Sequence, residues 1–119
     1  MKAVLATVAV ILAATLSACA VTEPLVVIGK DGQTLKGITT ARMSGHGRFT
    51  VTDGKLTCGG NYNSLNTEVT INIPVLCSDG REGFAVVTRE SNGVAGHGMV
   101  KMNDGSEWSF IFGSAAANF

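Results

Sequence analysis

The segment FTVTDGKLTC, residues 49–58, carries the plainest structural signal in the chain. Apolar and polar side chains alternate on both sides of a central Asp-Gly pair, which favours a two-residue hairpin turn. Such a turn pairs Val51 with Leu56 and Phe49 with Cys58, so all four side chains share one face. The segment therefore predicts a β-hairpin with one buried face.

The same turn signal recurs along the chain, with Asp-Gly or Asn-Gly pairs at 79–80, 92–93 and 104–105. β-branched residues are frequent between these pairs, and no stretch beyond residue 19 shows the 3.6-residue apolar period of a helix. A short sheet with open edges invites aggregation, so the sheet is expected to close. The prediction for residues 25–119 is one all-β domain, a small antiparallel β-barrel or sandwich of about 7–8 strands built from hairpins.

A second hairpin is expected around residues 103–105. A three-residue loop with Gly105 in the left-handed region pairs oppositely charged side chains, whereas a two-residue loop sets Lys101 against Trp108. The longer loop is preferred, and it places aromatic rings over bare glycine backbone. The resulting pairs are Lys101 with Glu107, Val100 with Trp108, Gly98 with Phe110, and Gly96 with Phe112.

The chain begins with a charged residue, Lys2, and an apolar run from Ala3 to Leu16. This run is about 14 residues long, whereas a membrane-spanning helix needs about 20 apolar residues. A charged start and a short apolar run are typical of an export signal. We therefore expect residues 1–18 to be a cleaved signal helix.

The residues that close the apolar run, Leu16-Ser17-Ala18-Cys19, resemble the lipobox of bacterial lipoprotein precursors. The resemblance implies cleavage before Cys19 and a diacylglycerol on its thiol, with residues 19–24 as a lipidated tether. Ala20 looks like a residue that permits transfer to the outer membrane of a Gram-negative bacterium. The alternative is an ordinary secretory signal cut at a small-residue site. The distal body, from the Gly45-His46-Gly47 motif to the closing Phe110-Ile111-Phe112-Gly113, also resembles small proteobacterial envelope lipoproteins, a resemblance that carries no function with it.

The cysteine count agrees with an exported protein. The chain has 3 cysteines, and lipidation of Cys19 leaves Cys58 and Cys77 as the pair that one structural disulfide requires. Basic and acidic residues are balanced at 9 each, and no basic run or basic-aromatic stripe is present. The composition therefore excludes a typical nucleic-acid-binding protein.

Two histidines and one loop are the candidate sites beyond the cysteines. His46 and His97 both lie in Gly-His-Gly motifs, 51 residues apart, which suggests an internal duplication or a coincidence of glycine-rich hairpins. They are weak candidates for a copper or zinc site, because no third ligand accompanies them. The segment Gly59-Gly60-Asn61-Tyr62 is a possible recognition loop, distantly similar to the Ser-Gly-x-x-Tyr loop of periplasmic lysozyme inhibitors, with Cys58 where the Ser should be. The alternative is that Tyr62 packs over glycine at a strand end.

No nucleophile elbow or other catalytic signature is present, so the chain is expected to be non-enzymatic and to need no cofactor. Arg81, Glu82, Arg89 and Glu90 are interpreted as a solvated charged face. The leading functional prediction is a membrane-anchored envelope lipoprotein that binds or supports a protein or peptidoglycan partner. Inhibition of a hydrolase such as lysozyme and metal binding through His46 and His97 are the alternatives.

Overall fold

Eight strands form a closed barrel, followed by one short 3-10 helix, in the computed structural model, which describes residues 19–119. The predicted signal segment, residues 1–18, lies outside the described residues. Within the described part, no helix is long and apolar enough to cross a membrane. The elements are β1 (Ala20–Gly29), β2 (Thr34–Arg42), β3 (His46–Thr52), β4 (Thr57–Asn63), β5 (Thr70–Cys77), β6 (Glu82–Arg89), β7 (Gly96–Met102), β8 (Glu107–Phe112) and η1 (Ser114–Asn118).

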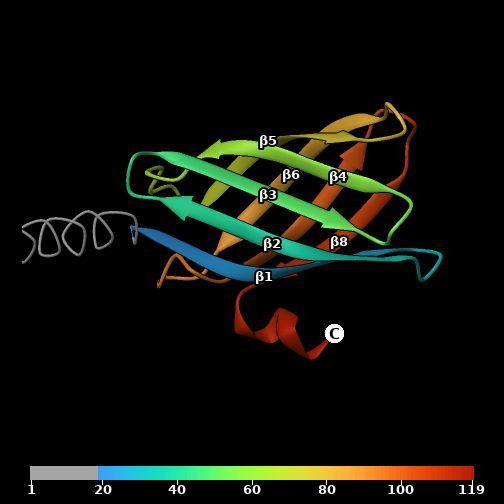
Figure 1. Ribbon diagram of the computed structural model, residues 1–119. Coiled ribbons are helices and arrows are strands. Elements are labelled where there is room, and N and C mark those ends of the chain that lie inside the picture. The colour runs from blue at the N-terminus through green and yellow to red at the C-terminus, as the bar shows by residue number, and fades with distance from the viewer. Residues whose placement is uncertain (1–18) are drawn as a thin grey trace, which may run out of the picture.

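Each strand pairs antiparallel with the next one in the chain, and β8 returns to pair with β1 (Figure 1). The predicted all-β fold is confirmed, and closure decides in favour of a barrel rather than a sandwich. Short hairpins produce this order because each strand meets its neighbour without a crossover. Closure also pairs the edges that an open sheet would expose.

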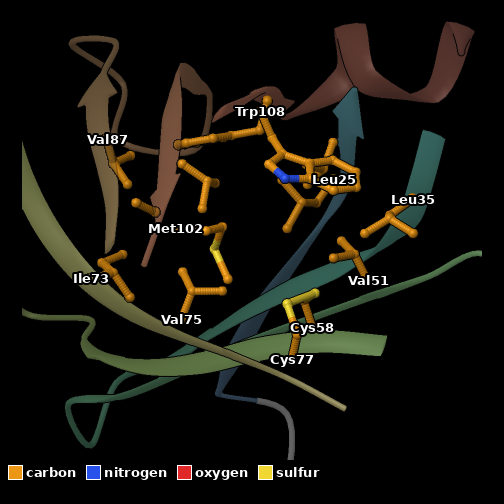
Figure 2. Packing of buried hydrophobic residues seen from close by; sticks show 14 residues of the cluster. Leu25, Leu35, Val51, Cys58, Ile73, Val75, Cys77, Val87, Met102 and Trp108 are labelled. Carbon is orange, nitrogen blue, oxygen red and sulfur yellow. A yellow bond between two sulfur atoms is a disulfide. The ribbon is translucent and has the colours of Figure 1, made fainter. Parts of the chain in front are cut away.

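The barrel interior is filled by every second side chain of the strands, as the period of two requires. In β5, for example, Ile73, Val75 and Cys77 are buried while the residues between them are exposed. Figure 2 shows side chains from strands all around the barrel pointing toward one another in its interior. The apolar core is therefore a single cluster enclosed by the sheet.

The hairpin between β3 and β4 has a longer turn than its Asp-Gly pair predicts. The last pairs are Thr52 with Thr57 and Val51 with Cys58, so the predicted pairs of Val51 with Leu56 and Phe49 with Cys58 are wrong by two residues. The carboxylate of Asp53 accepts hydrogen bonds from the backbone N–H groups of Leu56 (2.8 Å) and Lys55 (2.9 Å), which holds a four-residue turn. Both bonds lower the pKa of Asp53, to about 2, and the bond from Leu56 has the larger effect. A shift of two residues leaves every side chain on its predicted face.

The hairpin between β7 and β8 has the predicted three-residue loop. Gly105 has a φ of 87°, and the predicted pairs Val100 with Trp108 and Gly98 with Phe110 are present. A Cβ atom at Gly98 would lie 2.7 Å from Cζ of the Phe110 ring, closer than real Cβ atoms approach. The ring therefore needs the bare backbone beneath it, as the sequence indicates.

The expected tether between Cys19 and the domain is part of the first strand. β1 begins at Ala20, which pairs with Arg42, and the N–H of Met43 donates to the carbonyl of Cys19 over 3.3 Å. The tether prediction is wrong because β2 continues to Arg42 and offers backbone partners to residues before Pro24. Cys19 thus sits directly on the barrel, with its thiol free and exposed.

The seam between β4 and β5 is the least paired place in the barrel. Only Cys58 with Cys77 and Gly59 with Leu76 are paired there, whereas every other pair of neighbouring strands has at least five paired residues. The predicted disulfide joins Cys58 to Cys77 at this seam, with 4.0 Å between the Cα atoms. The disulfide is visible on the inner face in Figure 2, below Val51. It therefore closes the barrel where hydrogen bonds are fewest.

Candidate functional site

An apolar cavity occupies one half of the barrel interior. Its volume is about 110 Å³, close to the size of an engineered apolar cavity of about 150 Å³ that binds benzene. Its wall is formed mostly by aliphatic and aromatic side chains. The lining residues are Leu25, Val27, Thr39, Ala41, Phe49, Tyr62, Ser64, Ile71, Ile73, Ala85, Val87, Arg89, Gly93, Val100, Phe110 and Phe112.

The cavity opens at the end of the barrel that holds Cys19, here called the Cys19 end. This end is formed by the start of β1 and by the loops that join β2 to β3, β4 to β5 and β6 to β7, toward the left of Figure 1. Ser64 and Gly93, which line the cavity, belong to two of these loops. A molecule that enters the cavity therefore passes the loops beside Cys19.

At the opposite end, here called the far end, the Arg81 side chain lies beside a smaller apolar cavity of about 30 Å³. The Arg81 guanidinium lies 5.9 Å from the centre of the Trp108 ring and forms ion pairs with Asp79 (2.8 Å) and Asp104 (3.2 Å). Its side chain is only 25% exposed, so the prediction that Arg81 belongs to a solvated face is wrong. The N–H of Arg81 holds the pKa of Asp79 below its usual range, and the Ser106 hydroxyl and N–H do the same for Asp104. The Arg81 side chain therefore covers the core at this end of the barrel.

Tyr62 lies in the cavity wall, not in a recognition loop. The whole predicted segment Gly59–Tyr62 belongs to β4, and the Tyr62 ring packs over Gly47, where no Cβ atom would fit. The Tyr62 hydroxyl lies 2.7 Å from Oγ1 of Thr39, which satisfies both polar groups inside the barrel. The loop prediction is wrong because the strand partner β3 continues to His46 and pairs with all of β4. The alternative, a Tyr that packs over glycine at a strand end, is confirmed.

The two histidines lie on opposite sides of the barrel. His46 is in β3 and His97 in β7, and three strands separate β3 from β7 in either direction around the barrel. Both side chains are exposed, so one molecule cannot place them on the same metal ion. Among residues 19–119, no group of three or more His, Cys, Asp or Glu residues is arranged to hold a metal.

Sequence reasoning missed three features of the site: the cavity, the place of Arg89 in its wall, and the positions of Arg81 and Arg89 at opposite ends of the barrel. Ala41 and Ala85 leave the space that the cavity occupies, and a small residue at an inward strand position is the signal that could have shown this. Arg89 was assigned to the solvated face, but it lines the cavity, and its Nε donates to the carbonyl of Glu68 over 3.1 Å. Only the closed barrel shows that Arg81 and Arg89 lie at its two ends.

The solved structures that the chain resembles are small closed β-barrels. One is a de novo designed fluorescence-activating β-barrel, with 19% sequence identity, a TM-score of 0.57, and coverage of 76% of this chain and 88% of the designed one. Another is a redesigned β-barrel, with 17% identity, a TM-score of 0.57, and coverage of 77% and 87%. At these identities the likeness concerns the fold alone. No family model and no curated protein matches the chain.

Proposed function

We propose that this protein is a non-enzymatic, lipid-anchored envelope protein that binds a small apolar molecule, or the end of a hydrocarbon chain, inside its barrel. The observation that carries the ligand class is the apolar cavity of about 110 Å³. Apolar ligands gain free energy in such a space because the cavity walls replace water around them. The anchor rests on the lipobox-like residues that end at Cys19.

The outer membrane of a Gram-negative bacterium is the proposed location, and a protein or peptidoglycan partner is compatible with it. Such a partner would bind the outer wall of the barrel, where Leu76 and Phe84 are exposed. Crosslinking of intact envelopes and identification of the captured partner test this part of the proposal. The hydrolase-inhibitor alternative loses its support, because the Tyr62 segment on which it depended is a strand.

The anchor is tested by replacing Cys19 with Ser in the full-length chain. In the unchanged protein, mass spectrometry is expected to find a mature chain that starts at acylated Cys19 and sediments with membranes. The C19S variant is expected to remain uncleaved and unacylated, because the thiol that accepts the diacylglycerol is gone.

The matched control for this experiment is the double variant Cys58→Ala/Cys77→Ala. It removes the other two thiols and should still be acylated at Cys19. Acylation of the C19S chain, or an unmodified Cys19 in the mature unchanged protein, contradicts the anchor.

The ligand site is tested by filling the cavity from β6. Ala85 is buried and lines the cavity, so an Ala85→Leu variant takes up space that a ligand needs. We expect the unchanged protein to bind benzene, with shifts in the NMR signals of the cavity methyl groups. Binding by the variant should be about tenfold weaker, since the loss of roughly ten heavy-atom contacts at about 0.1–0.2 kcal/mol each costs about 1.4 kcal/mol.

The control is Ala117→Leu, which adds the same atoms at an exposed position of η1, outside the barrel. This variant should bind benzene like the unchanged protein. Equal binding by both variants, or no binding by the unchanged protein, would show that the cavity does not accept this class of ligand.

A further inference from the structure

Exposed apolar side chains gather in the loops of the Cys19 end. They come from the start of β1 and from all three loops of this end, and together they form what is here called the apolar rim. The rim consists of Val21 (46% exposed), Met43 (73%), Leu65 (56%), Val69 (66%) and Val94 (39%). No large apolar side chain is exposed in the four turns of the far end, residues 30–33, 53–56, 78–81 and 103–106. The two ends of the barrel thus differ in the exposure of large apolar side chains.

The rim loops are tied to one another and to the barrel. The Ser64 hydroxyl donates to the carbonyl of Arg42 over 2.5 Å, which joins the loop after β4 to the end of β2. The N–H of Arg89 donates to the carbonyl of Val69 over 2.9 Å, which joins the same loop to β6. These bonds fix the loop that carries Leu65 and Val69 on the barrel, so the exposure of these two side chains is a property of the folded barrel.

We propose that the apolar rim is a docking surface for the phospholipid bilayer. The bilayer is the occupant because only two residues separate the apolar segment of the precursor, residues 3–16, from Cys19, and Cys19 touches the loop that carries Met43. With β1 starting at Ala20, no flexible tether separates an acylated Cys19 from the rim. Acyl chains on Cys19 therefore bring the rim to the membrane surface, where exposed apolar side chains gain free energy.

Charge does not select the bilayer composition. The Cys19 end and the strand positions next to it carry three Arg and three Glu side chains, namely Arg42, Arg48, Arg89, Glu23, Glu68 and Glu90. A balanced set gives little net attraction to anionic lipids. Docking is consequently driven by the apolar rim, and it should depend little on salt.

Docking deepens the proposed function, on whose Cys19 anchor it rests. The cavity opens inside the ring of rim loops, since Ser64 and Gly93 both line it and neighbour rim residues. A docked rim turns this mouth toward the lipid phase and the charged far end toward the aqueous phase. The class of ligand that reaches the cavity is then one that partitions into lipid.

The test places a fluorescent label at either end of the barrel. The mature protein is purified and reconstituted in vesicles of phosphatidylethanolamine and phosphatidylglycerol, after a Met43→Cys or a Lys55→Cys substitution supplies one free thiol for an environment-sensitive dye. The label at position 43 is expected to emit at shorter wavelength and to be quenched by lipids with spin labels on their acyl chains. The label at position 55, in a far-end turn, should be quenched only from water. Water-like behaviour at both positions overturns docking.

The mass of the same sample shows whether Cys19 is acylated. The anchor and the docking can therefore be contradicted independently of each other. An acylated protein with a water-exposed label at position 43 overturns docking and leaves the anchor. In an unacylated protein the exposed Cys19 is a second free thiol, so the dye is then placed in a Cys19→Ser/Met43→Cys variant. A label of that variant that enters the bilayer overturns the anchor and supports docking, and a water-exposed label overturns both.

Matched triple variants test whether the rim side chains cause the docking. Removal of three rim residues, in Met43→Ser/Leu65→Ser/Val69→Ser, should lower the ratio of docked to undocked protein on the order of 100-fold, because three partly inserted side chains lose their transfer free energy. A label at position 94, introduced as Val94→Cys, reads this ratio. The control Leu76→Ser/Phe84→Ser/Val86→Ser removes three apolar side chains from the outer wall and should leave docking unchanged. Equal effects of the two triple variants, or no effect of the rim variant, overturn the proposal.

Discussion

Replacement of Cys58 and Cys77 together by Ala is expected to lower the free energy of unfolding by about 2–5 kcal/mol. The bridge closes a segment with a sequence separation of 19, so its loss returns chain entropy to the unfolded state. Both cysteines are also buried, and Ala at both positions leaves small gaps in the core. A small domain has only about 5–15 kcal/mol in total, so the variant is at the limit of folding at 37 °C.

The β4–β5 seam should respond more than the rest of the barrel. Only two residue pairs join these strands, and one of them is the bridged pair itself. Hydrogen exchange in the variant is therefore expected to rise most in β4 and β5, and least in β1 and β2, which share nine residue pairs. Uniform exchange around the barrel would show that the bridge acts only through the unfolded state.

Urea unfolding of the unchanged protein with and without reductant provides the control. Reduction should reproduce the loss seen in the double variant and should not destabilise the variant further. Thiol titration of the denatured, unreduced protein should find neither Cys58 nor Cys77 free. Two reactive thiols in that experiment, or equal stability of variant and unchanged protein, would contradict a stabilising bridge.

Replacement of Gly98 by Ala should cost about 3 kcal/mol or more, because overpacking with no room to relax lies at the upper end of its usual range. The new Cβ atom would overlap the backbone oxygen of Val86 and lie 2.7 Å from Cζ of Phe110. The oxygen is part of β6, which pairs with β7 along its length, so it cannot move without breaking the ladder. Urea unfolding of the variant measures the loss.

Gly32→Ala is the matched control for this substitution. Gly32 lies in the β1–β2 turn with nothing within 4 Å of an added Cβ, but its φ is 85°. The control therefore carries only the cost of a left-handed alanine, about 1–2 kcal/mol. A second variant, Gly98→Ala with Phe110→Leu, relieves the ring but not the Val86 oxygen, so it should recover only part of the stability. A Gly98→Ala cost no greater than that of Gly32→Ala would contradict the close approach.

Pairing across one hairpin could be predicted because its determinants are local. Gly98 and Phe110 are complementary in size, and Gly105 fits a left-handed loop position, so the register between β7 and β8 follows from residues 96–112. The β3–β4 turn was wrong in detail because the carboxylate of Asp53 binds two backbone N–H groups, an alternative that its Asp-Gly pair does not reveal. The error of two residues kept Cys58 in the core.

The candidate site was harder to predict because its parts come from distant strands. The cavity exists where Ala41 of β2 and Ala85 of β6 face the same interior, and only closure of the barrel brings those strands together. Tyr62 reads as a loop residue beside two glycines and Asn61, yet β3 supplies backbone partners that make it a strand residue. Sequence patterns predict on which face of its own strand a residue lies. They do not predict which other strand it faces across the barrel interior.

The sequence by itself determined the all-β class, the faces of the hairpins, the disulfide pair and the register of the last hairpin. These follow from the two-residue period, from turn chemistry and from cysteine count, all of which act over short distances along the chain. Only the tertiary structure decided that the closed sheet is a barrel and not a sandwich, that Cys19 adjoins an apolar rim, and that the cavity opens there while Arg81 covers the core at the far end. Those features depend on which strand ends meet in space. The alternation of apolar and polar side chains along each strand does not reveal this, because it is the same whichever way the sheet curves.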